Sequence, residues 1–262
     1  MILTNENYYS REANSEYMSV SQYKQFLKCE AAAMAQIRGE WEFPKTTALL
    51  VGSYIDSWFE GTLDEFKREN PEIYTQKGSL RADFVQAEQI IEFLKQDELF
   101  MEYMSGEKQT IFTGELFGVK WKIKIDSLRE FEIVDLKIMR SMERIMGRSF
   151  VEHWGYDLQM AIYSAIYRIV TGKHLETYLA VATKQTPPDK ELIHIPEWRR
   201  EELLGDVKKR MPRIIQVKSG RAEPERCGVC EYCRATKKLK GAIDFELVGL
   251  STAEVNALLG GL

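Results

Sequence analysis

The chain has 262 residues, of which 44% are hydrophobic and 29% are charged, and its formal net charge is −4. This composition indicates a globular protein with one large domain and argues against a surface that is basic throughout. No apolar run reaches the length of a membrane span, and the polar N-terminus lacks a signal-peptide core, so we expect a cytoplasmic protein whose four cysteines do not form disulfides.

The first helix is expected to follow a loosely held N-terminal arm, residues 1–18. Ser19 and Gln22 have the S-x-x-Q spacing of a capping box, and Gly39 is placed to end the helix. This helix would contain Cys29. Its expected inward face is formed by Tyr23, Phe26, Leu27, Ala31 and Met34.

Two more helices are expected over about residues 47–69 and 80–103, because apolar residues recur there at helical spacing. Asp56 lies among the apolar residues of the second helix, one turn after Gly52. None of its neighbours along that helix is a cation. Asp56 therefore lies either in a functional site or on an exposed edge of the helix.

Strands are expected next, over residues 110–117 and then twice within residues 120–139. Asp126 ends the second strand. Asp135 and Lys137 lie on one face of the third strand, which is apolar on both faces and so is expected to be central. A hairpin between these two strands would bring the three charged groups to one point.

Two carboxylates and an ammonium at a buried point need an explanation, because unpaired buried charge is costly. The structural explanation is an ion pair of Lys137 with Asp135 or Asp126, since a D-x-K triplet is common by chance. The functional explanation is a cation site. The two carboxylates and the Leu136 carbonyl are hard oxygen ligands suited to Mg²⁺, and Lys137 would orient or deprotonate a water.

The remaining elements alternate between helix and strand. An amphipathic helix begins after Gly155 and carries Gln159 and Tyr163 on one face. Strands are expected over 177–185 and 191–195, followed by a helix from Pro196 to about Val217. These elements indicate an α/β core with a mixed sheet. The segment from Arg199 to Lys240 contains 13 Lys and Arg against 6 Asp and Glu, which favours either phosphate binding or a solvated helix face with a charged tail.

The order α-β-β-β-α-β, with an acid ending one strand and D-x-K in the next, resembles the PD-(D/E)xK nuclease superfamily. KIDSL followed by EIVDLK is similar to the RecB-type and RecE-type exonucleases, such as exodeoxyribonuclease VIII. The resemblance covers roughly residues 19–235. It implies a restriction-endonuclease-like core, αβββαβ, in which helices flank a mixed central sheet, with extra N-terminal helices. A single nuclease domain would span 19–240, with a cysteine-tethered C-terminal segment and a tail over 241–262.

The resemblance also implies the active-site residues. The catalytic set would be Asp126, Asp135, Lys137, Gln159 and Tyr163. The ligands of Mg²⁺ or Mn²⁺ would be Asp56, Asp126, Asp135 and the Leu136 carbonyl. Without the resemblance, Gln159 could equally be a surface residue and Tyr163 a core residue. The chain departs from the pattern at Asp56, where the family often has histidine, at Ile125, where proline is usual, and at Ile138, where threonine or serine is common.

Cys227, Cys230 and Cys233 form the motif C-x2-C-x2-C, and Cys29 is the one other cysteine. Such a compact trio suits an iron–sulfur cluster, whereas zinc sites more often use two separated C-x2-C pairs. Buried free thiols are the third alternative. The set resembles that of the AddB-type and CRISPR-associated nucleases, which implies a [4Fe–4S] cluster with Zn²⁺ as the alternative. Its expected role is structural, tying the C-terminal segment to the first helix.

The function implied by the resemblance is that of a metal-dependent DNA exonuclease, a phosphodiester hydrolase that leaves a 5′-phosphate during phage-type or recombination end processing. The implied partners are linear duplex DNA ends, a strand-annealing recombination protein and further copies of the chain. Two alternatives belong to other classes. One is a DNA-binding module without catalysis, and the other is a metal-stabilised interaction protein on the same fold.

Overall fold

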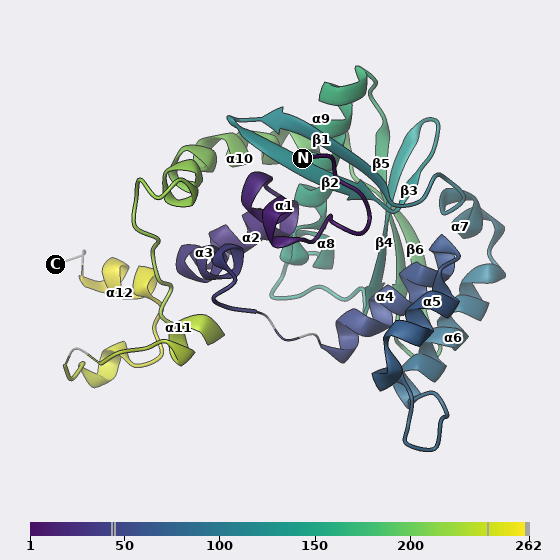
Figure 1. Ribbon diagram of the computed structural model, residues 1–262, viewed down its shortest axis with the longest axis horizontal. Helices are drawn as coiled ribbons and strands as arrows, with labels where there is room; N and C mark the ends of the chain where they lie inside the picture. Colours follow the sequence, from purple (N-terminus) through teal and green to yellow (C-terminus); the bar gives the residue numbers. More distant parts are fainter. Residues whose placement is uncertain (43, 45, 240, 260–262) are drawn as a thin grey trace. The chain divides into compact units, whose positions relative to one another are not determined.

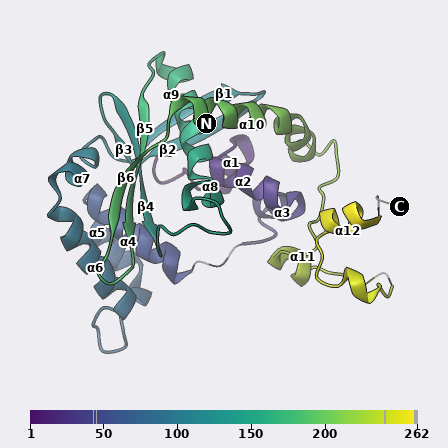
Figure 2. The ribbon, with the colours of Figure 1, turned by 180° about the vertical axis from the view of Figure 1, so that it is seen from behind.

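The computed structural model describes residues 1–42, 44, 46–239 and 241–259 (Figure 1; seen from behind in Figure 2). The described residues form two compact units. The first unit is drawn from residues 1–43, 117–121 and 207–262, and the second from 44–116 and 122–206. Among the helices described, none combines the length and the apolar character that crossing a membrane requires.

A mixed sheet forms the centre of the second unit. Its strand order is β3-β4-β5-β6, comprising Ser127–Leu128, Glu132–Met139, Glu176–Thr183 and Lys190–His194. The central pair, β4 and β5, is parallel, and each outer strand is antiparallel to its neighbour. Strands β1 (Thr110–Leu116) and β2 (Val119–Ile125) form a separate hairpin. This is the mixed α/β architecture that the sequence predicts.

Helices cover this sheet and supply most of the core of the second unit. They are α4 (Thr47–Glu60), α5 (Leu63–Glu69), a 3₁₀ turn (Pro71–Ile73), α6 (Ala82–Lys95), α7 (Glu98–Tyr103), α8 (Phe150–Trp154) and α9 (Tyr156–Thr171). Buried residues of α4, α6 and α7 pack with the sheet residues Val134, Leu136, Ala180 and Ala182 in one apolar cluster. The helix α9 packs against β1, β4 and β5. Residues Ile133 to Leu136 of β4 are all buried, so this strand is covered on both faces, as expected of a central strand.

Two helices expected to be continuous are each divided. The segment predicted as one helix over 47–69 breaks after α4, because Gly61 adopts a left-handed conformation (φ 77°) that caps the helix. The segment predicted over 80–103 breaks where the Asp97 side chain accepts a hydrogen bond from Phe100 N and starts α7. The short helix α8, started by the capping box of Ser149 and Glu152, was not expected.

The first unit is helical. It contains α1 (Arg11–Glu16), α2 (Val20–Lys28), α3 (Glu30–Arg38), the second half of α10 (Glu197–Lys218), α11 (Glu231–Ala235), a 3₁₀ turn (Phe245–Leu247) and α12 (Thr252–Leu259). Residues 1–18, expected to be loosely held, include α1 and the fully buried Ala13. Met18 N also donates to Lys120 O at 2.7 Å. The division into arm, nuclease domain and tail stays a prediction.

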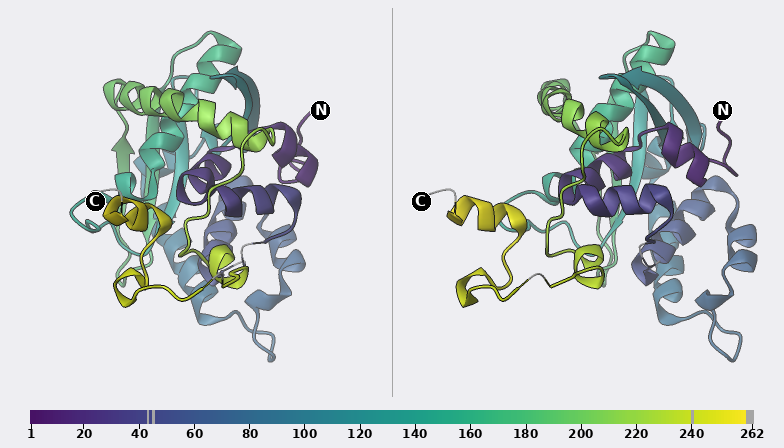
Figure 3. Two further views of the ribbon diagram at one scale, coloured as in Figure 1. Left: turned by 90° about the vertical axis from the view of Figure 1, so that its left-hand side faces the viewer. Right: turned by 60° about the vertical axis from the view of Figure 1, so that its left-hand side comes forward.

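The prediction of one helix from Ser19 to Gly39 is wrong, since α2 and α3 are two separate helices (Figure 3). Cys29, between them, has an extended backbone (φ −165°, ψ 108°). At the ends, the Ser19 side chain accepts from Gln22 N and Gly39 is left-handed, as expected. The predicted capping box is only half formed, since the Gln22 side chain donates to Asn14 O. Leu27, expected to face inward, lies in α2 before the break and is 45% exposed, whereas Ala31 and Met34 of α3 are buried as expected.

Candidate active site

Asp126 lies where β2 ends and β3 begins. The antiparallel register pairs Ser127 with Val134, so the next step along the ladder sets Asp126 opposite Asp135. Two donors hold the Asp126 carboxylate. Leu136 N donates to its Oδ2 at 2.9 Å, and Gln109 Nε2 donates to its Oδ1 at 3.3 Å. The predicted hairpin between residues 120–126 and the D-x-K strand is wrong in its strands, since β2 pairs with β1 and the two-residue strand β3 pairs with β4. The turn after β3 still brings the first acid to the strand that carries the D-x-K triplet.

Asp135 and Lys137 point to the same face of β4, because alternate residues of a strand share a face. The Lys137 ammonium forms an ion pair with Asp135 Oδ2. Gln159, projecting from α9, donates through Nε2 to Asp135 Oδ1 at 2.5 Å. Lys137 Nζ also lies 5.0 Å from the centre of the Tyr156 ring, an arrangement that favours the charged amine. The structure thus joins four of the predicted residues into one contiguous group.

Asp56 and its partner one turn later, Glu60, extend the negative charge from α4. Burial, with the negative charges of Asp135 and Glu60, raises the pKa of Asp56 to about 7. Burial and the charges of Asp135 and Asp56 likewise raise the pKa of Asp126 well above its usual value. The pKa of Lys137 is raised as well: burial opposes the charge, but the attraction of Asp135 and Asp126 exceeds it. The raised pKa values show that these buried carboxyl groups oppose one another's ionisation, a cost that a bound cation would relieve.

A divalent cation fits this donor set. The carboxylate oxygens and the Leu136 carbonyl are hard ligands, and excess negative charge strengthens cation binding. Asp135 Oδ2 is buried and accepts no hydrogen bond from the described residues, so its contact is the Lys137 ion pair. The carboxylates of Asp56, Asp126 and Asp135 interact through their charges without yet gathering to one point. The assignment of metal ligands therefore stays a proposal.

Three residues of this group could not be found from a motif. Glu60 lies four residues after Asp56, so only the helical period links the two acids. Lys124 shares a strand face with Asp126, and its charge reaches Asp56 and Glu60. Gln109 has a positive φ of 52°, rare for a residue other than glycine, and its side-chain amide donates to the Asp126 carboxylate.

Tyr163 is buried on α9 one turn after Gln159, and its catalytic role stays a prediction.

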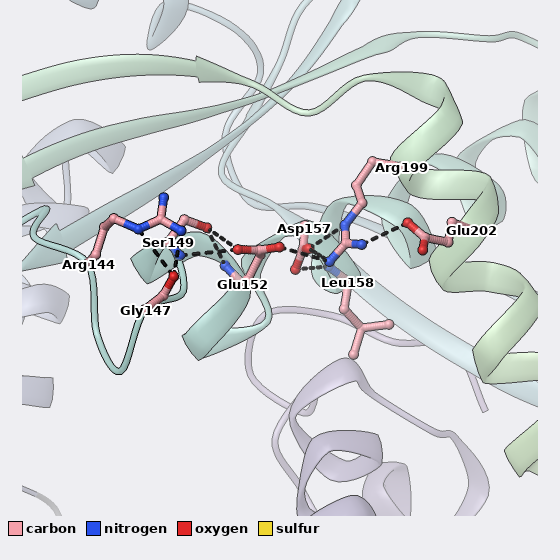
Figure 4. Close-up of polar contacts among 8 residues, drawn as sticks. All are labelled: Arg144, Gly147, Ser149, Glu152, Asp157, Leu158, Arg199 and Glu202. Atoms are coloured by element: carbon pink, nitrogen blue, oxygen red, sulfur yellow. Dashed lines mark hydrogen bonds and ion pairs between the residues drawn. The ribbon is translucent and has the colours of Figure 1, made fainter.

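An ionic network fixes the start of α9, the helix that carries Gln159 (Figure 4). Arg199 of α10 donates to Asp157 Oδ2 through Nε at 2.9 Å, and its Nη2 lies 2.8 Å from the same oxygen. The same guanidinium reaches Glu202 at 2.7 Å and Glu152 of α8 at 3.6 Å. Asp157 is buried, and its Oδ1 accepts from Leu158 N. Arg199 is therefore placed to position Gln159 through the helix.

The four cysteines form the second candidate site, which lies within the first unit. Their sulfur atoms all lie within 4.8 Å of one another, with Cys29 and Cys233 at 3.6 Å and Cys227 and Cys233 at 4.0 Å. In the described parts of the chain, this is the one set of three or more ligating side chains that already converges. The extended backbone at Cys29 supplies the fourth sulfur. This four-cysteine set, predicted from the spacing, can hold a metal.

Backbone N–H groups favour the thiolate forms that bind metal, whereas burial opposes the loss of the thiol protons. Cys227 Sγ accepts from Cys230 N, Cys230 Sγ accepts from Cys233 N, and Cys29 Sγ accepts from Cys227 N, at 3.4 to 3.5 Å. Although burial opposes it, the N–H groups of Cys230 and Val229 lower the pKa of Cys227 to about 7. Burial raises the pKa of Cys230 to about 12 and also raises that of Cys29.

Neighbouring contacts hold the cysteine trio to α3. Glu30 accepts from Arg213 at 2.7 and 3.0 Å and from Glu225 N at 2.8 Å, and Ala31 N donates to Glu225 O at 3.0 Å. The residue after Cys29 thus binds the segment that leads into the trio. The predicted link between the C-terminal segment and the first helical region is present as direct contacts.

Comparisons with known proteins agree with this arrangement. Residues 19–236 match the family described as a PDDEXK-like domain of unknown function (DUF3799). The crystal structure of a "putative exonuclease" from Eubacterium rectale has 52% sequence identity and a TM-score of 0.91, covering 95% of this chain and 99% of that chain. No curated protein matches. The superfamily resemblance and the restriction-endonuclease-like fold are confirmed, and the chain belongs to this family of PDDEXK-like domains.

Proposed function

We propose that the protein is a divalent-metal-dependent deoxyribonuclease that hydrolyses phosphodiester bonds as an exonuclease of the RecB/RecE type. The observation that carries the proposal is the group formed by Asp126, Asp135, Lys137 and Gln159 on adjoining strands and one helix. The Eubacterium rectale protein, described as a "putative exonuclease", supports this reading. A phage or recombination role, with a strand-annealing partner and self-association, remains part of the proposal.

Asp56, Asp126, Asp135 and the Leu136 carbonyl would hold Mg²⁺ or Mn²⁺, which supplies Lewis-acid stabilisation of charge on the phosphoryl oxygen. Lys137 has a raised pKa and therefore carries its proton at neutral pH. In this protonated form it is a hydrogen-bond donor and a positive charge that would orient a water or a phosphoryl oxygen. Gln159 and Leu136 N hold the carboxylates of Asp135 and Asp126 in fixed orientations.

The test is digestion of linear duplex DNA with and without Mg²⁺. We expect cleavage only with the metal, products with 5′-phosphates, and a loss of at least about 100-fold in Asp126→Asn. Glu191→Gln, a change at an exposed position of β6, is the matched control and should retain the wild-type rate. Metal-independent binding of DNA without cleavage would favour a DNA-binding module. No binding of DNA would favour a metal-stabilised interaction protein.

We also propose that the four cysteines hold a structural metal group. Two occupants fit different observations. The sequence arrangement resembles that of [4Fe–4S] nucleases, whereas the sulfur separations of 3.6 and 4.0 Å suit one tetrahedral ion, since Zn–S bonds of about 2.3 Å give sulfur separations of roughly 3.8 Å. A cluster carries each thiolate on a separate iron and holds them farther apart. Iron, sulfide and zinc analysis of protein purified without oxygen decides between these occupants.

A further inference from the structure

The loop between β4 and α8, residues 140–149, starts three residues after Lys137. Three residues span at most about 11 Å, so Arg140 is held near the candidate active site by the chain itself. The loop contains Arg140, Arg144 and Arg148, all exposed, against the single acid Glu143. No ion pair is recorded for Arg140 or Arg148 within the described parts of the chain.

A tight turn forms the tip of this loop. Ile145 and Arg148 exchange two backbone hydrogen bonds, of 2.9 and 3.0 Å, around Met146 and Gly147. Both central residues have positive φ, 49° and 78°. This is the pattern of a type I′ turn, in which asparagine followed by glycine is the favoured pair. Methionine rarely adopts this left-handed conformation, because its Cβ then crowds the following carbonyl oxygen.

The side chain of Met146 gains nothing from packing to offset this strain, because it is 92% exposed. The hairpin turn at Phe117 and Gly118 also places a bulky residue at positive φ (52°), but the Phe117 ring there is partly buried. An exposed apolar side chain in a strained conformation points to a partner that covers it when bound.

The loop is held in shape rather than free (Figure 4). Arg144 donates to Gly147 O through Nη2 at 2.5 Å and through Nε at 3.2 Å, across the turn. At the base, Ser149 N and Oγ donate to Glu152, whose other oxygen lies 3.6 Å from Arg199. These contacts fix the conformation of the loop and hold Met146 at its tip. A side chain that inserts into a ligand needs such a rigid support.

We infer that this loop is a wedge for duplex DNA ends. Exposed arginines grip the phosphates beside the scissile bond, while the thioether of Met146 stacks on the terminal base pair and separates it. Met is among the side chains that proteins insert between base steps, and arginine is the usual phosphate contact. The inference rests on the proposed nuclease function and extends it to the substrate, namely paired ends that must be opened before cleavage.

The test compares the wild type with Met146→Asn, which suits the turn better and therefore keeps the loop folded. Each protein is given Mg²⁺ and either a blunt duplex or the same duplex with a short mismatched end. We expect Met146→Asn to cut the blunt end roughly tenfold more slowly, and the mismatched end at the wild-type rate. Equal rates on the blunt end, or an equal loss on both substrates, would overturn the wedge while leaving the nuclease proposal intact.

A binding measurement separates this inference from the proposed function. A 2-aminopurine at the terminal pair brightens when it is unstacked, with no cleavage needed. In EDTA, wild-type protein should raise this fluorescence and Met146→Asn should not. That result supports the wedge even if no cleavage is found with Mg²⁺. The same signal from both proteins, or from neither, refutes it and leaves Met146 as a surface for another partner.

Discussion

Lys137 stands between a structural and a catalytic explanation, because its ammonium already pairs with Asp135. Lys137→Ala should lose cleavage by at least about 100-fold while still binding DNA. With Mg²⁺ present, it should melt near the wild-type temperature, since the cation replaces the lost charge beside the carboxylates. Thermal melts and cleavage assays, each with and without Mg²⁺, check both expectations.

The matched control is Lys95→Ala, which removes a more exposed ion pair, 2.8 Å long, to Glu92. It should change neither quantity. An active Lys137→Ala would remove Lys137 from the proposed site. A variant that loses about 3–5 kcal/mol of stability even with Mg²⁺ would establish the purely structural ion pair.

The raised pKa of Asp56 predicts how stability depends on pH. In the folded protein this pKa is about 7, against 3.8 for an unperturbed carboxyl, so between these values the folded state binds more protons than the unfolded state. The free energy of unfolding therefore falls as pH rises through this window. Asp56→Asn removes this loss, and in EDTA at pH 8 it should be more stable than wild type by on the order of 1 kcal/mol.

Denaturant titrations in EDTA at pH 4 and pH 8 measure this difference. The two proteins should be nearly equal at pH 4, where Asp56 is largely protonated when folded. Asp64→Asn, at an exposed position of α5, should follow wild type at both values. A stability gain that does not depend on pH would refute the electrostatic origin.

At the scale of elements, the sequence predicts the strands and the long helices better than the points where helices break. Period-two alternation locates β2, and the unbroken apolar run locates β5, because the polarity of each strand residue follows whether that residue is buried. The break at Cys29 has no local signal, since alanine-rich sequence favours a continuous helix. The reason for the break lies about 200 residues away in the cysteine trio, which only the folded chain brings near.

The same reasoning explains the candidate site. Asp126, Asp135 and Lys137 were predictable because adjacent strands fix their spacing in the sequence. Gln109 was not predictable. Its side chain donates to Asp126 from a left-handed backbone conformation, and no local sequence pattern indicates that conformation. Contacts set by tertiary structure rather than by periodicity remain beyond a sequence-based prediction.

Cys29→Ser tests whether the break between α2 and α3 serves the metal group. We expect loss of the bound metal, and of any brown colour, together with faster proteolysis after residue 220, because ligation of this kind contributes directly to folding. Metal analysis and limited proteolysis give the readouts. Lys28→Ala, an exposed change one residue earlier, should alter neither. Full metal content in Cys29→Ser would exclude Cys29 from the ligand set.

On the scale of the whole molecule, a net charge of −4 coexists with three exposed arginines on the loop that we propose contacts DNA, Arg140, Arg144 and Arg148. Affinity for DNA should therefore fall steeply with salt, since each phosphate contact releases counterions. Arg148→Ala should reduce the slope of log affinity against log salt by about 1. Fluorescence anisotropy over a salt series measures this slope.

Lys173→Ala, at an exposed position beyond α9, is the matched control and should keep the wild-type slope. An unchanged slope in Arg148→Ala would show that Arg148 makes no phosphate contact.

The first unit is built from three separate segments of the chain, and this affects the order in which the protein folds during synthesis. It is assembled from residues 1–43, 117–121 and 207–262, so its earliest helices must wait for the last part of the chain. Cys29 and Cys227 are 198 positions apart, which at ordinary rates of synthesis separates their emergence from the ribosome by roughly 10–40 s. During that interval the second unit can fold around its sheet, while Cys29 remains an exposed thiol with no partner sulfur. With the metal that we propose for the four cysteines, capture of that metal is the closing step of folding. A cell short of it would then accumulate chains with a formed candidate active site and an open first unit.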